Sequence, residues 1–554
     1  MTTRREFLQV TAATGSAFIL GFNSETAFSQ AGKATEVNAW IVVEPNDRVI
    51  IRYARSEMGQ GSMTSAAQLV AEELECDWAK VRVEYAETNA QVLRKRPWGD
   101  MAAVGSRTIR QSQQYLRQAG ATARTMLVSA AAQAWGVPEA ECSAAGGVIT
   151  HGPSKRKTSF GKVAAAAAKL EAPKEVKLKD PKEWKVIGKP IPRVDIPDTV
   201  MGRQRYGIDA QLPGMAYAAI AQCPVFGGRL KSANGAKIAG RRGVIQVIPM
   251  EDFVAVVADN WWRAKEALRD LPIEWEPGPA ANSSSASIEQ LLRAGLDSPT
   301  DVVSALKKGD AATAMTGAAR VIEAEYFTPY LAHATLEPMG CTALIKDGRV
   351  DVWTSTQNAE ATHAVAAAVA GVPLENVYVH RVQLGGGFGR RGGSQDFVRQ
   401  GVAIAKVMPG TPVKLLWTRE EDTQHDFYRP ISLTRFKAGL DVAGRPVAWQ
   451  SRVVAPSIIA TLLKLPLKEG IDPQAVASFA DQPYEIANVN VEYAQRNPHV
   501  PVGFWRTVGH SQNPFMRECF VDELAHAAGK DPYEYRRSLL SGTSKELLIM
   551  EATA

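Results

Sequence analysis

The pattern of hydrophobic and polar positions between residues 37 and 84 predicts strands, a glycine loop and a helix. An apolar run at residues 49–51 indicates a buried strand. Apolar side chains then recur at helical spacing, at Met63, Ala67, Val70 and Leu74. The glycine loop, residues 59–61, lies between the two, and Ser62 stands at the position of a helix N-cap. We therefore expect the loop to point its backbone N–H groups at a ligand above the start of the helix.

The rest of the chain carries further elements of both kinds. Residues 110–135 form an alanine-rich amphipathic pattern that predicts a long helix. Further strands are predicted at 244–248, 253–257, 377–384 and 412–417, and further helices at 261–268, 395–407 and 515–528. Residues 385–393 form a glycine-rich loop between a strand and a helix. This mixture predicts an α+β or mixed α/β fold with several domains.

Changes of composition suggest where those domains meet. Residues 169–198 are rich in lysine and proline, which predicts a solvated, extended linker. The linker separates a first domain, residues 35–168, from a compact α+β module at residues 199–300. Residues 301–554 form the last predicted domain.

Composition excludes several classes of protein. The chain has 554 residues and a net charge of +6, which no basic stripe or basic amphipathic helix concentrates. We therefore expect neither nucleic-acid binding nor integration into a membrane. The five cysteines lie far apart, without a C-x-x-C pattern, so an iron–sulfur cluster, an attached haem or a zinc ribbon in this chain is disfavoured. The sequence has no H-E-x-x-H and no G-x-S-x-G, which disfavours zinc and serine hydrolases.

The N-terminus has the order of features that an export signal has. Arg4 and Arg5 precede a short apolar stretch at residues 10–22, and small residues follow around Ala27. This order predicts a twin-arginine-type signal peptide at residues 1–30 and export of the folded protein to the periplasm. The alternative interpretation is a chance arginine pair on an N-terminal helix.

The glycine-rich loop at residues 385–393 allows two functional interpretations. Gly387, Gly389 and Gly392 formally satisfy G-x-G-x-x-G, which is typical of dinucleotide binding. That interpretation requires an acidic residue about 20 positions downstream, and Glu420 and Glu421 stand near that distance. The other interpretation is a loop whose backbone N–H groups approach an anionic or oxo-bearing ligand closely.

Several short motifs favour the second interpretation. They are EMGQG at residues 57–61 with Thr64 and Gln68, LEPMGCT at 336–342, STQN at 355–358, QLGGGFG at 383–389, WRTVGHSQ at 505–512, and DELA at 522–525 followed by Asp531-Pro532. Taken together, the chain from about residue 37 to 540 resembles the molybdopterin-binding large subunit of the xanthine-oxidase-type molybdenum hydroxylases. Within that family it is most similar to the branch of isoquinoline 1-oxidoreductase beta subunits and aldehyde dehydrogenase large subunits.

The resemblance implies a molybdopterin-type molybdenum cofactor, with the cytosine dinucleotide form as one option. The family holds its metal chiefly by hydrogen bonds, so no direct protein ligand to the metal is implied. Three residues would have catalytic roles: Gln357, Phe388 and Arg506. The residues that would bind the cofactor are Gly59, Gln60, Gly61, Thr64, Gly105, Ser106, Gln357, Gly386, Gly387, Phe388, Gly389, Arg506 and Gly509. Taken one by one, a surface glutamine, a tight turn and a surface ion pair are the alternative interpretations of Gln357, the 59–61 loop and Arg506.

The resemblance also implies an activity and partners. The reaction would oxidise an aldehyde or an N-heteroaromatic compound, with water as the source of oxygen. Electrons would leave to a small [2Fe–2S] subunit, with a cytochrome c beyond it, because this chain has no iron–sulfur, haem or flavin motif. The module at residues 203–277 would be the family's α/β hammerhead domain, inserted within the molybdopterin-binding subunit.

The chain departs from the family in one respect. The family's general base is a glutamate in a G-x-G-E stretch near the C-terminus, and this sequence contains no G-x-G-E. We therefore expect a chain that lacks the C-terminal completion of the molybdopterin-binding domain, with Glu57 and Glu337 in structural roles. Two alternative functions stay open: a non-catalytic remnant or cofactor-binding scaffold, and a nucleotide-dependent dehydrogenase that uses the 385–393 loop.

Overall fold

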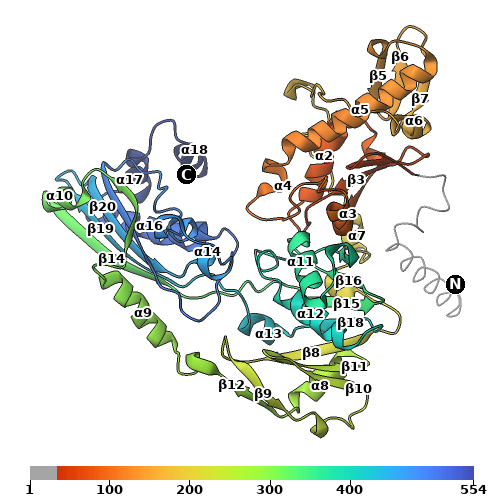
Figure 1. Cartoon of the computed structure of the whole chain (residues 1–554). Coiled ribbons are helices and arrows are strands. Elements are labelled where there is room, and N and C mark those ends of the chain that lie inside the picture. Colours follow the sequence, from red (N-terminus) through yellow and green to blue (C-terminus); the bar gives the residue numbers. More distant parts are fainter. Residues whose placement is uncertain (1–33) are drawn as a thin grey trace.

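The computed structural model describes residues 34–554, and three sheets dominate it (Figure 1). The predicted signal peptide lies outside the described residues. The first sheet has the order β1-β2-β3-β4, and its last two strands are parallel. Its strands are β1 (Thr35–Asn38), β2 (Ile41–Val43), β3 (Val49–Tyr53) and β4 (Val81–Tyr85). The helices α2 (Ser62–Leu74) and α5 (Gln113–Trp135) pack against each other beside it, close to the predicted helical segments.

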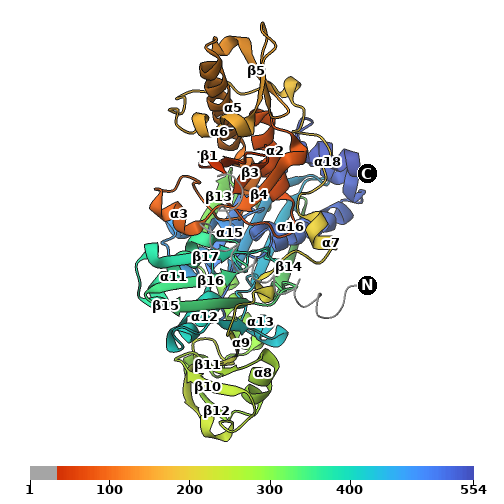
Figure 2. The same cartoon turned by 90° about the vertical axis from the view of Figure 1, so that its right-hand side faces the viewer.

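A smaller unit extends this N-terminal part. It consists of a three-stranded sheet, β5 (Cys142–Ala145), β6 (Val148–His151) and β7 (Lys157–Ser159), and the helix α6 (Phe160–Ala167). Short helices α3 (Thr88–Leu93) and α4 (Arg107–Arg110) complete the part of the chain that precedes residue 136. Figure 2 shows this N-terminal part at one end of the molecule and β10 to β12 at the other.

The second sheet has seven strands in the order β10-β11-β8-β18-β15-β16-β17. Its strands are β8 (Ala216–Gln222), β10 (Val244–Pro249), β11 (Phe253–Ala258), β15 (Gly340–Lys346), β16 (Arg349–Thr354), β17 (Val377–Arg381) and β18 (Val413–Leu416). The helices α8 (Trp261–Arg269), α11 (Ala359–Ala370) and α12 (Asp396–Val407) pack on it, and β9 (Arg229–Ala233) and β12 (Ile273–Glu276) form a separate pair nearby.

This sheet crosses the boundary that the sequence suggests at residue 300. Strand β8 pairs in parallel with β18, so strands from residues 199–300 and from residues 301–554 share one set of hydrogen bonds. The physical reason lies in β8, which pairs with β11 along one edge and with β18 along the other. A strand with an unpaired edge exposes backbone N–H and C=O groups, and β18 supplies the partners for them. The local pattern does not reveal that the next partner in that sheet comes from a segment far downstream.

The third sheet has the order β13-β21-β20-β19-β14 and lies in the C-terminal part of the chain. Its strands are β13 (Val303–Lys308), β14 (Arg320–Thr328), β19 (Ser432–Leu440), β20 (Pro446–Ala455) and β21 (Asn488–Gln495). The main helices around it are α9 (Ser285–Asp297), α10 (Ala311–Thr316), α16 (Gly509–Ala527) and α17 (Pro532–Leu539). The Phe436 and Phe520 rings stack at 5.0 Å, so β19 and α16 share one aromatic core.

Part of the predicted linker is held against the first domain, although most of its residues are exposed. Residues 179–195, which we call the strap, lie along α2. Glu72 is buried, and its carboxylate accepts the backbone N–H groups of Lys185 at 2.8 Å and Val186 at 2.6 Å. Burial raises the pKa of the Glu72 carboxyl, but the Lys179 ammonium and these backbone donors outweigh burial and lower that pKa. The sequence pattern missed this packing because the carboxylate that attracts the strap lies on a helix far earlier in the chain.

One buried arginine fastens the first sheet to the second. Arg381, at the end of β17, donates through Nη1 to the carbonyls of Ala54 at 2.5 Å and Arg55 at 3.2 Å. It also donates to the carbonyl of Ala86, at the end of β4. Burial lowers the pKa of Arg381 to about 10, so its guanidinium stays charged at neutral pH. Within residues 34–554 no helix is long and apolar enough to cross a membrane.

Candidate functional site

Five segments from distant parts of the chain meet where the three sheets approach one another. The backbone N–H of Ala103 donates to the carbonyl of Gln357 at 2.7 Å, and that of Leu384 donates to the carbonyl of Glu57 at 3.4 Å. The backbone N–H of Arg506 donates to the carbonyl of Phe388 at 2.6 Å. The segments joined in this way are 56–63, 102–106, 355–358, 384–393 and 504–509. The structure therefore brings together four of the motifs that the resemblance singles out, those at residues 57–61, 355–358, 383–389 and 505–512, and adds residues 102–106 to them.

Gln357 is the central side chain of this arrangement. It follows β16 and precedes α11, and only 3% of it is exposed. Its Oε1 accepts the backbone N–H of Gly389 at 2.9 Å, and its Nε2 donates to the carbonyl of Ala103 at 3.1 Å. A side-chain amide carries two N–H donors, and the Ala103 contact uses one of them. The other is the donor with which Gln357 can meet an oxygen of a ligand.

The glycines of the 385–393 loop allow close approach of chain to chain. A Cβ at Gly387 would lie 2.5 Å from Gln357 Oε1 and 3.0 Å from Met58 Sδ. A Cβ at Gly389, where φ is +111°, would lie 1.5 Å from the carbonyl oxygen of Phe504. Because these glycines pack against other segments of the site, a dinucleotide has no free loop to approach. The dinucleotide interpretation of G-x-G-x-x-G therefore has no support in the structure.

Phe388 and Arg506 lie in contact with each other. The Arg506 guanidinium lies 4.3 Å from the centre of the Phe388 ring and 4.8 Å from that of Trp505. Both residues adopt positive φ, +55° at Phe388 and +48° at Arg506, a conformation that costs energy and clusters at functional sites. Arg506 is exposed and Phe388 is 40% exposed. A cation held on two aromatic faces can bind an anionic group of a ligand.

A buried charged cluster lies behind the glycine-rich loop. Arg390 makes two 2.8 Å contacts with Asp396 and one 2.9 Å contact with Asp426. Asp426 in turn contacts His333, whose Nε2 lies 3.1 Å from the carbonyl oxygen of Phe504. Burial raises the pKa of the Asp426 carboxyl, but His333 and Arg390 outweigh burial and lower it. Sequence reasoning missed Arg390 and Asp426 as supports of the loop, although the paired arginines within a glycine run were a visible signal.

The 59–61 loop differs from the expectation in what its N–H groups contact. Those of Gly59, Gly61 and Met63 each donate to the Glu57 carboxylate at 2.9 Å. Glu57 is buried, so the chain's own carboxylate occupies the start of helix α2. Ser62 is the first residue of α2, and Gly61 takes the N-cap position with φ of +77°. Two of the donors that we expected to face a ligand, the N–H groups of Gly59 and Gly61, are thus already used.

Two other residues of this segment that were predicted to bind the cofactor form hydrogen bonds within the chain. Thr64 is buried, and its Oγ1 accepts the backbone N–H of Val194 at 3.0 Å. The Gln60 amide donates to the carbonyl of Ser56 at 3.0 Å and accepts the backbone N–H of Met58 at 2.7 Å. These contacts give both side chains a structural role in the loop.

The remaining predicted residues lie at the edges of the site. Gly105 and Ser106 form an exposed turn with φ of +58° and +54°, beside Val104, which packs close to Gly392. Gly509 is the buried first residue of α16, where a Cβ would lie 2.0 Å from the carbonyl oxygen of Gln474. Gly386, with φ of +99°, lies next to the Phe388 ring.

The carboxylates of Glu57 and Glu337 both serve the backbone. Glu57 holds the 59–61 loop as described. Glu337 accepts the backbone N–H of Gly385 at 2.9 Å and that of Ile208 at 3.0 Å. Carboxylates engaged in this way are structural acceptors, as expected from the sequence. Across residues 34–554 no group of three or more His, Cys, Asp or Glu side chains is arranged to hold a metal ion.

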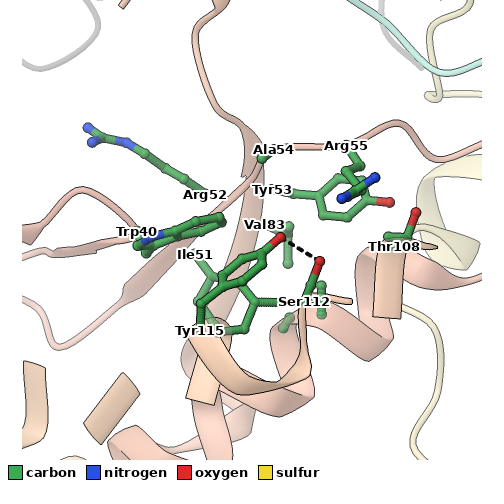
Figure 3. Close-up of a pocket in the computed structure, with 13 residues that line it drawn as sticks. Trp40, Ile51, Arg52, Tyr53, Ala54, Arg55, Val83, Thr108, Ser112 and Tyr115 are labelled. Atoms are coloured by element: carbon green, nitrogen blue, oxygen red, sulfur yellow. Dashed lines mark hydrogen bonds between the residues drawn. The ribbon is translucent and has the colours of Figure 1, made fainter. Parts of the chain in front are cut away.

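A small cavity near the site is not a ligand pocket. It lies beside β3 and the start of α5, where Tyr53, Arg55, Ser112 and Tyr115 line it and the two hydroxyls of Ser112 and Tyr115 are hydrogen-bonded (Figure 3). Its volume is about 10 Å³, which is room for about one water molecule. Ligand pockets are usually larger by more than an order of magnitude.

Known proteins are similar to this chain over most of its length. Two family models, both described as "Molybdopterin cofactor-binding domain", match residues 4–201 and 296–540. The chain is 29% identical to the "Membrane-bound aldehyde dehydrogenase [pyrroloquinoline-quinone]" of Gluconacetobacter polyoxogenes, over 92% of this chain and 68% of that protein. It is 27% identical to the beta subunit of isoquinoline 1-oxidoreductase of Brevundimonas diminuta, over 94% of this chain and 72% of that protein.

Other similar proteins are longer. A nicotinate dehydrogenase subunit of Pseudomonas putida is 28% identical over 94% of this chain, which spans 44% of that protein. Among solved structures, quinoline 2-oxidoreductase from Pseudomonas putida 86 superposes with a TM-score of 0.54 at 20% identity, over 66% of this chain and 51% of that one. The aldehyde oxidoreductase of Desulfovibrio gigas gives 0.51 at 18% identity, over 64% and 43%. These two superpositions show a shared fold.

Proposed function

Because this chain belongs to the molybdopterin-binding large subunits of the xanthine-oxidase-type molybdenum hydroxylases, we propose that its five-segment site binds the molybdenum cofactor and oxidises an aldehyde or an N-heteroaromatic compound. One observation carries the proposal. The amide of Gln357, the strained Phe388–Gly389 backbone and the exposed guanidinium of Arg506 come from three separate segments and converge.

The residues present fit a cofactor that is held by hydrogen bonds. Gln357 retains an amide N–H donor, and Gly387 keeps a Cβ out of the space between Gln357 and Met58. Arg506 offers a charged, exposed guanidinium. The site offers neutral and charged hydrogen-bond donors, and the described residues 34–554 include no cluster of metal-ligating side chains. Such a site suits an oxo-bearing metal that is held by its own organic ligand.

When bound, the cofactor would supply the oxygen transferred to the substrate and accept the electrons that leave it. Gln357 would hold an oxygen atom of the cofactor by its amide N–H. Arg506 would bind a negatively charged oxygen of the cofactor or substrate, and the Phe388 ring would keep that guanidinium in position. Phe388 would also present an aromatic face to an apolar or aromatic substrate. Glu57 and Glu337 shape the loops and take no proton in this scheme.

The proposal also covers the form of the cofactor, the proteins that receive the electrons, and the location of the protein in the cell. We propose the cytosine dinucleotide form of molybdopterin, a separate [2Fe–2S] subunit that receives the electrons, and a cytochrome c beyond it. The similarity to proteins named as subunits of oxidoreductases supports a partner. Arg4 and Arg5 support export to the periplasm by the twin-arginine route.

An oxygen-labelling experiment tests the reaction. The protein is produced in a molybdate-fed host that makes the cofactor, together with its [2Fe–2S] partner, and is given an N-heteroaromatic compound with a dye as electron acceptor, because an aldehyde would exchange its carbonyl oxygen with water. The proposal predicts that product formed in H₂¹⁸O carries the label. Unlabelled product in H₂¹⁸O, or turnover that depends on NAD(P), would contradict it.

A further inference from the structure

The strap follows one face of helix α2 from its end to its beginning. Thr64, Gln68 and Glu72 are four residues apart, so their side chains lie on the same face of the helix. Each of the three binds the strap. Glu72 accepts strap N–H groups, the Gln68 amide donates to the carbonyl of Val186 at 3.2 Å, and Thr64 accepts the N–H of Val194. The strap therefore runs antiparallel to α2 and reaches the 59–61 loop at its end.

Arg193 is the strap residue that contacts this loop. Its Nη1 donates to the carbonyl of Gly59 at 2.7 Å, and its Nη2 lies 3.5 Å from the Glu57 carboxylate. Asp195 fixes the guanidinium by two contacts, of 2.9 and 2.5 Å. A Cβ at Gly61 would lie 3.7 Å from the Arg193 side chain, which shows that the arginine covers the loop. Arg193 thus binds a carbonyl of the loop while Glu57 binds its N–H groups, and the two side chains lie close to each other.

The inner side of the same loop faces the centre of the site. Met58 approaches Gly387, which in turn lies against Gln357. A shift of Gly59 would therefore move Met58 relative to the segment that carries the ligand-facing amide. A shift of one segment is transmitted to the next, because closely packed segments cannot move independently without losing their contacts.

We propose that the strap holds the 59–61 loop in the shape that the cofactor requires, with Arg193 as its positioning residue. Arg193 acts here through Gly59 and Glu57 and does not touch the cofactor itself. This inference rests on the proposed function, because the ligand whose binding it controls is the molybdopterin-type cofactor. It also assigns a role to residues that the sequence indicates to be a solvated linker.

Two substitutions of Arg193 and one control test the inference. Arg193→Gln removes the charge, and Arg193→Lys keeps a cation that can still reach the Gly59 carbonyl. The control is Arg203→Gln, because Arg203 lies soon after the strap and forms an exposed ion pair with Asp198 at 2.9 Å, away from the loop. All three variants and the wild type are produced as full chains, with and without molybdate in the growth medium.

The first measurement is hydrogen exchange of the Gly59, Gly61 and Met63 amides in protein made without molybdate. Loss of a hydrogen bond to a charged group changes an equilibrium by about tenfold or more. We expect about tenfold faster exchange of these amides in Arg193→Gln, with partial recovery in Arg193→Lys and wild-type exchange in Arg203→Gln. Wild-type exchange in Arg193→Gln would overturn the inference.

The second measurement is molybdenum retained per chain after dialysis of protein made with molybdate. We expect Arg193→Gln to retain several-fold less than the wild type and Arg203→Gln to retain the same amount. Faster loop exchange with unchanged retention would overturn the positioning role. A wild type that retains no molybdenum would overturn the proposed function, and with it the cofactor half of this inference. The exchange result would then still decide whether the strap holds the loop.

Discussion

The side-chain carbonyl of Gln357 accepts the backbone N–H of Gly389 at 2.9 Å, and this bond links the end of β16 to the glycine-rich loop. The Gln357 side chain is shielded from water, since it is 3% exposed. An isolated loss of the side chain would leave the Gly389 N–H and the Ala103 carbonyl without their partner. Such orphaned groups carry a cost of about 1–3 kcal/mol each.

We predict that Gln357→Ala lowers the free energy of unfolding by about 2 kcal/mol and abolishes most of the bound molybdenum. Gln357→Glu serves as the comparison, because its carboxylate can still accept the Gly389 N–H but cannot donate to the Ala103 carbonyl. We expect Gln357→Glu to be no more stable than Gln357→Ala, because a buried carboxylate would face the Ala103 carbonyl oxygen, and also to lose cofactor. Urea denaturation and metal analysis measure the two effects. Full cofactor content in both variants would show that Gln357 only supports the loop.

Substitutions of Glu57 distinguish a structural role of its carboxylate from a catalytic role. Its carboxylate accepts three backbone N–H groups at the start of α2, so Glu57→Ala should destabilise the chain by about 2–3 kcal/mol. Glu57→Gln retains an acceptor oxygen and should cost less. The two variants are compared by chemical denaturation and by turnover under conditions where the protein is folded. If Glu57→Gln were as stable as the wild type but inactive, Glu57 would be the proton acceptor and our assignment would be wrong.

The strap should respond to pH through Glu72. The pKa of this carboxyl is lowered on folding, so the stability it contributes is present above its usual value of 4.5 and is lost as the pH falls through the lowered pKa. At the alkaline end, burial lowers the pKa of Lys179, but Glu72 and Glu75 outweigh burial and raise it. The contribution of Lys179 is therefore lost only as the pH rises through that raised pKa.

We predict that acid releases the strap before the rest of the chain unfolds. Limited proteolysis between residues 179 and 195, followed from pH 7 downward, measures the release. Glu72→Gln should make the strap sensitive to protease already at pH 7, with a loss of about 1.5–3 kcal/mol in the free energy of unfolding. If the strap resisted protease equally well at pH 7 and at the lowest pH at which the chain stays folded, in the wild type and in Glu72→Gln alike, the role given to Glu72 would be contradicted.

Arg381 should couple the unfolding of the first two sheets. Its guanidinium donates to carbonyls just beyond the ends of β3 and β4, and within residues 34–554 it forms no ion pair with a carboxylate. Arg381→Met keeps much of the side-chain volume but leaves these buried carbonyls without a donor. We expect calorimetry of this variant to show the N-terminal part melting in a separate, earlier transition, and a total loss of about 3 kcal/mol or more. A single transition at the wild-type temperature would rule out the coupling.

The proposed export would depend on two arginines outside the described part of the chain. Replacing Arg4 and Arg5 by lysine keeps the charge but removes the two guanidinium groups. We predict that the double variant stays in the cytoplasm as folded protein. Cell fractionation measures the distribution, and a periplasmic fraction equal to that of the wild type would disprove twin-arginine export.

The sequence predicted the local elements well, for physical reasons. Helices α5 and α12 have apolar faces long enough for their period to be read directly. Gly387 and Gly389 are glycines because a Cβ there would collide with Gln357 and Phe504, and such constraints keep a motif recognisable. The motifs therefore pointed to the residues that the fold brings together.

What the sequence could not predict depends on how the chain folds in three dimensions. Nothing in the 59–61 motif indicates that Glu57 takes up its N–H groups, because the choice between a ligand and a side chain is made only when the loop closes. The strap has the composition of a linker, and its attachment depends on side chains of α2 such as the buried Glu72, which the linker sequence does not reveal. The pairing of β8 with β18 is likewise set by a long-range register that no local pattern encodes.

The central claim is that the site around Gln357 and Arg506 holds a molybdenum cofactor. The most direct test is the molybdenum and oxidised-pterin content of the wild-type chain purified from a molybdate-fed, cofactor-competent host, beside that of Gln357→Ala. We predict a molybdenum-to-protein ratio near unity with matching pterin fluorescence in the wild type, and a strong loss of both in the variant. A wild-type chain free of molybdenum and pterin under these conditions would contradict the account.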